Sequence, residues 1–155
     1  MSLPHFTPLW LPLLLLAGCA PDTRSLEFED GTPFLETSWR DQHLHGPFRQ
    51  WYPGGNPERE LHYRDGERTG EWVWWYENGQ VKRRGSFDDG WRHGSWSTWH
   101  ENGQLQFQGE YQAGDKLGLW RGWYEDGSPS YEETWDTGTR LAVKRFPKPA
   151  APAAD

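Results

Sequence analysis

The chain has 155 residues, a length that fits one domain, and a net charge of −7, which argues against a nucleic-acid partner because such partners need a basic surface. It contains 12 tryptophans and no isoleucine, so a thick aliphatic core is excluded and a thin sheet stabilised by large rings is favoured. A single cysteine excludes an intramolecular disulfide.

The chain begins with a segment that we expect to be a targeting signal. Leu9 to Ala17 is apolar apart from Pro12 and is shorter than the roughly 20 residues of a membrane-spanning helix. It leads into Leu-Ala-Gly-Cys, which resembles the bacterial lipobox, where cleavage precedes a cysteine that carries acyl chains. An ordinary signal peptide followed by a chance cysteine is the alternative.

The lipobox resemblance implies how this end of the protein is processed. Residues 1–18 would be a lipoprotein signal peptide, Cys19 the lipid attachment residue and membrane anchor, and residues 19–23 a short linker. Several acyl chains on one cysteine anchor stably. In lipoproteins of Gram-negative bacteria an Asp after the cysteine favours the inner membrane, so Ala20 implies a cell-envelope protein anchored in the outer membrane.

Residues 24–141 repeat with a period of 24 residues, and such periods indicate repeat architectures. The copies share three glycine columns: Gly46, Gly70, Gly94 and Gly118; Gly55, Gly79, Gly103 and Gly127; Gly66, Gly90, Gly114 and Gly138. They also share aromatic columns, among them Phe48, Trp72, Trp96 and Trp120, and Trp51, Trp75, Trp99 and Trp123. A weaker copy with Phe28, Gly31 and Trp39 precedes them.

Each copy is predicted to be a β-hairpin. The pairs at its first turn are Asp30-Gly31, Gly54-Gly55, Asn78-Gly79, Asn102-Gly103 and Asp126-Gly127. Such pairs tolerate positive φ at both positions of a two-residue type I′ turn, so we expect a turn glycine at Gly31, Gly55, Gly79, Gly103 and Gly127. A two-residue turn at Asn78-Gly79 places Trp72 opposite Gly85, with the ring over that glycine. The predicted fold class is all-β: an elongated single-layer antiparallel meander of about five hairpin repeats.

Strand alternation assigns the side chains to two faces. One face should be aromatic and packed, with these members in one copy: Trp72, Trp74, Tyr76, Val81 and Phe87. The other should be polar, with Lys82, Arg84 and Ser86. The exception on the polar face is the column Trp51, Trp75, Trp99 and Trp123, which we interpret as a candidate binding stripe. The alternative is that these rings lie flat over neighbouring strands.

The rest of the chain offers little chemistry. Residues 142–155 are rich in Pro and Ala and are expected to be a disordered tail. The column Glu77, Glu101 and Glu125 recurs beside turns, as solubility residues do, and His43 and His45 lack further converging ligands. We therefore expect no catalytic residues, no metal site and no cofactor, which leaves an enzyme as the least favoured class.

The pattern Gly-x-Trp-x-x-Trp/Tyr-Tyr-x-Asn-Gly-Gln, then an aromatic and Asp-x-Gly, resembles the bacterial variant of the MORN repeat, most clearly in residues 70–87 and 94–111. The resemblance implies an elongated antiparallel sheet that acts as an interaction scaffold. Part of this group is the YwqK-type antitoxin family, which implies a protein partner, with a toxin as one candidate.

Two functions follow as expectations. The first is a non-catalytic, membrane-anchored protein-interaction scaffold, with a toxin-neutralising antitoxin or immunity protein as its narrower form. It depends on the aromatic face, because a single-layer sheet cannot cover that face and an exposed aromatic patch marks an interaction site. The alternative is a lipoprotein that binds a cell-envelope glycan, peptidoglycan, by stacking sugars on the column that contains Trp75.

Overall fold

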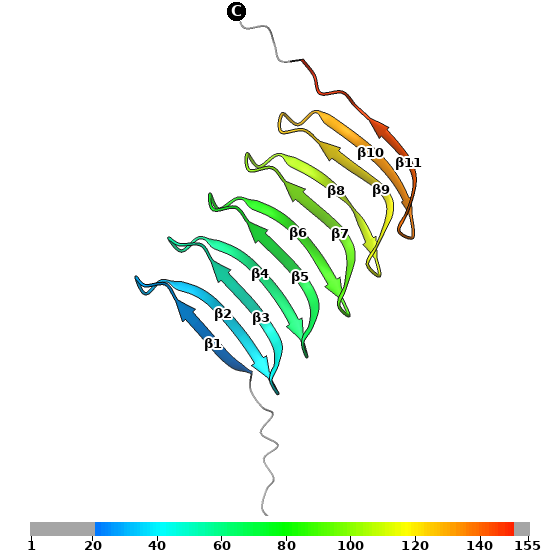
Figure 1. Ribbon diagram of the computed structural model, residues 1–155. Helices are drawn as coiled ribbons and strands as arrows, with labels where there is room; N and C mark the ends of the chain where they lie inside the picture. Colours follow the sequence, from blue (N-terminus) through cyan, green and yellow to red (C-terminus); the bar gives the residue numbers. More distant parts are fainter. Residues whose placement is uncertain (1–20, 151–155) are drawn as a thin grey trace, which may run out of the picture.

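The chain forms one antiparallel β-sheet, a single layer thick (Figure 1). The computed structural model describes residues 21–150. The sheet has 11 strands, and their hydrogen-bonded order is their order in the sequence. The prediction of an all-β meander of hairpin repeats is confirmed. Cys19, the signal peptide, and the last five residues lie outside the described part.

The strands are six to nine residues long. Their bounds are β1 (Asp22–Glu27), β2 (Pro33–Arg40), β3 (His43–Trp51), β4 (Pro57–Arg64), β5 (Glu67–Trp75), β6 (Val81–Asp88), β7 (Trp91–Trp99), β8 (Leu105–Gln112), β9 (Asp115–Trp123), β10 (Pro129–Asp136) and β11 (Thr139–Arg145). Each 24-residue copy is one hairpin, from β1–β2 to β9–β10, and β11 follows the fifth hairpin.

The sheet extends further at both ends than the repeat pattern predicted. β1 begins at Asp22, inside the expected linker, and β11 runs to Arg145, four residues into the expected tail. Phe146 N–H donates to Ser130 O at 2.9 Å, and Phe146 O accepts a hydrogen bond from the Tyr124 hydroxyl. In the two preceding tyrosine-containing copies a tryptophan carbonyl accepts the equivalent hydrogen bond, so Phe146 takes the place of that tryptophan in the last copy.

The aromatic face packs against itself. Trp72, Trp96 and Trp120 are only 6%, 4% and 1% exposed. Phe87 lies between the first two, with ring centroids 4.5 Å and 5.3 Å away, and Tyr111 lies between the last two at 5.8 Å and 5.0 Å. These five rings, which we call the aromatic ladder, cross from β5 to β9. The expectation of an exposed patch on this face is therefore wrong at its centre.

Basic side chains cover the ladder. Arg68 lies 4.7 Å from the Phe87 ring centroid, Arg92 lies 5.1 Å from that of Trp96, and Lys116 lies 4.3 Å from that of Trp120. The three cations are themselves spaced by one repeat, so each of the third, fourth and fifth hairpins supplies a cation–π cover. Burial lowers the pKa of Lys116, which reflects how far this ammonium group is desolvated over the rings.

The expected pairing of Trp72 with Gly85 is correct, but the ring over that glycine comes from elsewhere. Gly85 lies beneath Trp96 of the next hairpin, and Gly109 lies beneath Trp120. The indole Nε1 of Trp96 also donates to Ser86 O at 3.2 Å. Each ladder tryptophan therefore joins its own hairpin to the preceding one.

The Asn-Gly turns are not two-residue type I′ turns, and that prediction is wrong. Gly79 N–H donates to Tyr76 O at 2.9 Å, and Tyr76 N–H donates to Gln80 O at 2.8 Å. The loop thus has three residues, and Gly79 alone carries positive φ, at +85°. This is a type I turn followed by a left-handed residue, the common three-residue hairpin loop. Positive φ is confirmed for all five predicted turn glycines: Gly31, Gly55, Gly79, Gly103 and Gly127.

Two-residue type I′ turns occur at the other ends of the strands, where one hairpin leads into the next. Asp89 and Gly90 both have positive φ, at 44° and 81°, and they connect the paired residues Asp88 and Trp91. Gly90 N–H donates to the carbonyl oxygen of Arg68, near the start of β5. The turn that joins β6 to β7 is therefore also held to β5.

At the strand ends that carry the Asn-Gly turns, side chains connect the repeats. The Tyr76 hydroxyl donates to Trp99 O at 2.8 Å. Asn78 Oδ1 accepts from Gln80 N–H, and Asn78 Nδ2 donates to Glu101 O at 3.1 Å. The tyrosine and asparagine columns therefore recur because each satisfies a backbone carbonyl of the following hairpin.

A candidate interaction surface

The four tryptophans of the predicted stripe lie on the face opposite the aromatic ladder, which we call the second face. Each is the last residue of its strand, in β3, β5, β7 or β9, and each is half-buried. Each pairs across the hairpin with an apolar residue at the start of the next strand. The pairs are Trp51 with Pro57, Trp75 with Val81, Trp99 with Leu105, and Trp123 with Pro129.

These eight residues form an apolar band that we call the tryptophan stripe. It crosses the sheet from β3 to β10 and receives one residue from every strand. Strand alternation places one of these partners, Val81, on the packed face, and Pro57 and Pro129 are assigned to neither face. The signal was nevertheless present: the residue six positions after each stripe tryptophan is always apolar.

A β-bulge produces the stripe. Trp74 pairs with Arg83, but Trp75 pairs with Val81, so Lys82 is an additional residue on β6. The bulge places Val81 beside the tryptophans of the second face, where it shares a hollow with Trp99. Lys82 instead lies against Tyr76, its Nζ atom 5.2 Å from the ring centroid. The predicted faces of Val81 and Lys82 are therefore wrong, whereas Arg84 and Ser86 keep theirs.

Ion pairs border the stripe on its inner side, toward the middle of the strands. Arg84 Nε lies 3.2 Å from Glu71 Oε1, and Arg121 Nε lies 3.5 Å from Glu132 Oε1. Near the first stripe tryptophan, Arg49 reaches carboxylates on both neighbouring strands. Burial lowers the pKa of Arg49, but the hydrogen bonds that Arg49 donates to the two carboxylates outweigh this, and its pKa is raised. Arg84 and Arg121 are thus each paired with one carboxylate, whereas Arg49 is shared by two.

The outer border, formed by the Asn-Gly turns, is acidic. Glu77, Glu101 and Glu125 are exposed there, one in each of three successive turns. The electrostatic effect reaches Tyr76, whose pKa is raised first by burial and then by Glu101 and Glu125. Around Arg84 and Arg121 the stripe therefore separates a border of one-to-one ion pairs from a negative border of exposed glutamates.

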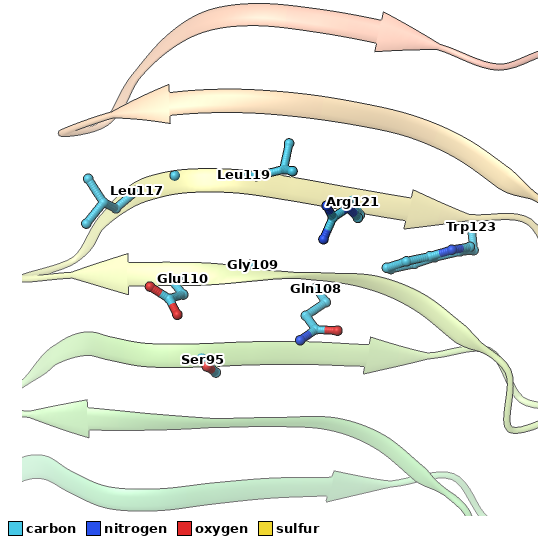
Figure 2. A pocket seen from close by; sticks show the side chains of 9 residues that line it. Ser95, Gln108, Gly109, Glu110, Leu117, Leu119, Arg121 and Trp123 are labelled. Atoms are coloured by element: carbon cyan, nitrogen blue, oxygen red, sulfur yellow. The ribbon is translucent and has the colours of Figure 1, made fainter.

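Two hollows open along the stripe. One, of about 270 Å³, lies between Trp123, Arg121 and Gln108 and continues past Leu119. Figure 2 shows the Trp123 ring edge-on, pointing back along β9 toward Arg121 and Gln108. The other, of about 350 Å³, lies between Trp99, Val81 and Arg84. The Trp123 ring thus forms a wall of its hollow rather than a flat platform.

The described residues place no group of three or more His, Cys, Asp or Glu side chains where they could hold a metal ion. His45 Nδ1 instead lies 3.1 Å from Asp65 Oδ1, and Arg40 donates to the same carboxylate at 2.8 Å. The hydrogen bond from Arg40, with a smaller one from His45, lowers the pKa of Asp65. Within residues 21–150, no helix has the length and apolar character needed to cross a membrane.

Fold and surface together define a class: a non-globular array of β-hairpin repeats with one self-packed face and one open face. The sequence model of the MORN repeat variant family matches four segments of the chain, residues 44–65, 68–89, 92–113 and 116–136. These cover more than half of the sequence, and the chain belongs to the MORN repeat variant family. MORN repeats are, in general, modules for interaction with proteins or membranes. No curated protein matches the chain.

Proposed function

We propose that the protein is a non-catalytic, lipid-anchored scaffold that binds a partner protein through the tryptophan stripe. The observation that carries this proposal is an apolar band, continuous over eight strands, on a face that no other part of residues 21–150 covers. A few residues contribute most of the binding energy of protein interfaces, and Trp is enriched among them. The rings of the aromatic ladder are already buried against each other, so the second face is the better candidate for a binding surface.

The anchor in this proposal is Cys19, after removal of residues 1–18. Its support is the lipobox-like sequence and the absence of a second cysteine from the chain. Only two residues separate Cys19 from β1, so the anchor would hold the β1 end of the array within about 10 Å of the lipid attachment point. Ala20 supports placement in the outer membrane of a Gram-negative bacterium.

The narrower form of the proposal is a toxin-neutralising antitoxin or immunity protein. Its support is the resemblance of these repeats to the YwqK-type family. A toxin gene beside this one would strengthen it.

A second candidate is binding of a peptidoglycan glycan strand. The stripe tryptophans are spaced by one hairpin, about 9–10 Å, which suits an extended ligand that touches several of them. Sugars stack on ring faces, whereas Trp123 presents its edge in Figure 2, so we place this candidate second.

A crosslinking pull-down from the native envelope tests the proposal. The wild-type chain should capture a partner protein that Trp75→Ala and Trp99→Ala chains do not capture. Trp91→Ala is the matched control, because Trp91 is 63% exposed at the opposite end of β7. Sedimentation with purified peptidoglycan that depends on the same tryptophans would support the glycan candidate instead. Equal capture by all variants would refute a role for the stripe.

A further inference from the structure

The spacing of apolar residues along the stripe distinguishes a helical partner segment from an extended one. It presents one apolar residue per strand, and neighbouring strands are about 4.8 Å apart. One turn of an α-helix rises about 5.4 Å, and an amphipathic helix presents about one apolar residue per turn along its face. An extended peptide instead presents a side chain on one face about every 6.6 Å. The stripe therefore matches a helix that crosses the strands.

The length of the stripe sets the length of the contact. The central section from Trp75 to Trp123 covers four strand intervals, about 19 Å. This corresponds to about 13 residues of helix, or between three and four turns. The hollow between Trp99 and Val81 and the one beside Trp123 lie in this section, where apolar side chains of such a helix could enter them.

The charges on the two borders set the orientation of the partner. Glu77, Glu101 and Glu125 line the outer border, one hairpin apart, whereas Arg84 and Arg121 on the inner border are already paired with carboxylates. A helix with Lys or Arg along the flank that faces the turns would complement this pattern, and an acidic flank there would be repelled.

We propose that the central stripe, from Trp75 to Trp123, is a docking site for an amphipathic α-helix of a partner protein, with its basic flank toward the acidic turns. This inference rests on the proposed function and names the partner's form. Residues 21–150 contain strands only, so this part of a second copy of the chain could not supply the helix.

The test uses the full-length chain in detergent and three fluorescent 16-residue peptides of identical Leu, Lys and Ala composition. One has Leu at helical spacing and Lys along one flank, one alternates Leu with polar residues, and one is scrambled. The helical peptide should bind at least tenfold more tightly than the other two and gain helical circular dichroism on binding. Equal binding of all three, or preference for the alternating peptide, would overturn the proposal.

Variants locate the site. Trp99→Gln should weaken binding of the helical peptide at least tenfold, and the matched control Trp91→Gln on the same strand should leave it within twofold. The triple variant Glu77→Gln, Glu101→Gln, Glu125→Gln should weaken binding and reduce its dependence on salt. Equal effects of Trp99→Gln and Trp91→Gln would overturn the proposal, as would stripe-dependent binding of soluble peptidoglycan fragments without a helical preference. If the envelope pull-down still depends on the stripe in those cases, the scaffold function stands and only the helical form of its partner is wrong.

Discussion

Trp96 of β7 lies directly over Gly85 of β6, so closely that a Cβ atom on Gly85 would lie 2.2 Å from Cδ2 of the indole ring. The same relationship recurs one repeat later, where a Cβ atom on Gly109 would lie 2.1 Å from Trp120. Both glycines lie in strands and have no left-handed backbone. Their role is therefore to leave space for the ring that connects one hairpin to the next.

Gly85→Ala should destabilise the array by about 1–3 kcal/mol, because the added methyl group forces the Trp96 ring out of its position. Urea denaturation measures the loss. A double variant Gly85→Ala/Trp96→Leu provides the control, since the smaller side chain no longer needs the space. The two changes should then cost less together than the sum of the single variants, and strict additivity would contradict this packing.

Gly79→Val should cost about 1–3 kcal/mol for a different reason. A Cβ atom on Gly79 meets nothing within 4 Å, but its φ of +85° is a left-handed conformation that a β-branched residue resists. Gly79→Asn should be milder, because Asn tolerates this region. A Gly79→Val chain with an unchanged Tm would contradict the turn geometry.

The sequence predicted the sheet well because its period and its glycine and aromatic columns describe one hairpin repeated. The predicted strand register in the body of the hairpin is also correct, because Trp72 pairs with Gly85 as expected. The predicted turn type is wrong, since Asn-Gly suits both a two-residue type I′ loop and a three-residue loop with a left-handed glycine. The extra loop residue and the bulge at Lys82 compensate each other, so the register in the body of the hairpin is correct despite the wrong turn.

The faces near the turns could not be predicted for the same reason. A bulge changes the side to which residues beside it point, and alternation alone gives no sign of one. Val81 therefore joins the tryptophan stripe rather than the ladder. Likewise, alternation shows that Trp96 belongs to the packed face but not that its ring lies over a glycine of the preceding hairpin, because that depends on how neighbouring hairpins stack.

Acid should weaken the last Asn-Gly-type turn through Asp126. Its pKa is lowered, first by the hydrogen bond from the Ser128 hydroxyl and then by the one from Ser128 N–H. Because the folded-state pKa lies below the unfolded value of about 3.9, the carboxylate stabilises the fold above that pH and the effect is lost as pH falls through the folded-state pKa. An NMR titration of the Asp126 carboxyl group should show the low pKa.

Asp126→Asn is the matched variant for this pH dependence. The amide oxygen of Asn can still accept from Ser128 N–H, as Asn78 Oδ1 accepts from Gln80 N–H in the third hairpin. The variant should fold at neutral pH and lose this part of the acid sensitivity. A carboxyl group that titrates at or above its ordinary value in the wild-type chain would refute the assignment.

Cys19→Ser should release the protein from the membrane fraction, since the acyl chains of the proposed anchor need the thiol. Fractionation and metabolic labelling with a fatty acid measure the effect. Ala20→Ser is the control, because it leaves the cysteine in place. If Cys19→Ser chains stay in the membrane fraction, the anchor is elsewhere.

The two tryptophan columns should differ in what their removal costs. Trp72 is 6% exposed within the aromatic ladder, with Phe87 4.5 Å away, so Trp72→Ala should lower the stability by about 3–5 kcal/mol. Trp75 is only half-buried on the second face, so Trp75→Ala should cost less stability and instead reduce affinity for the partner.

Thermal melts and the envelope pull-down, performed on Trp72→Ala and Trp75→Ala side by side, separate these roles. The melt measures the stability that the aromatic ladder contributes, and partner capture by chains that are still folded measures the affinity that the stripe contributes. Because the hairpins interact mainly with their neighbours, Trp72→Ala should weaken the array around β5 first. If Trp75→Ala destabilises the fold as much as Trp72→Ala does, the stripe tryptophans contribute to the sheet's own packing, and their role as a binding surface is wrong.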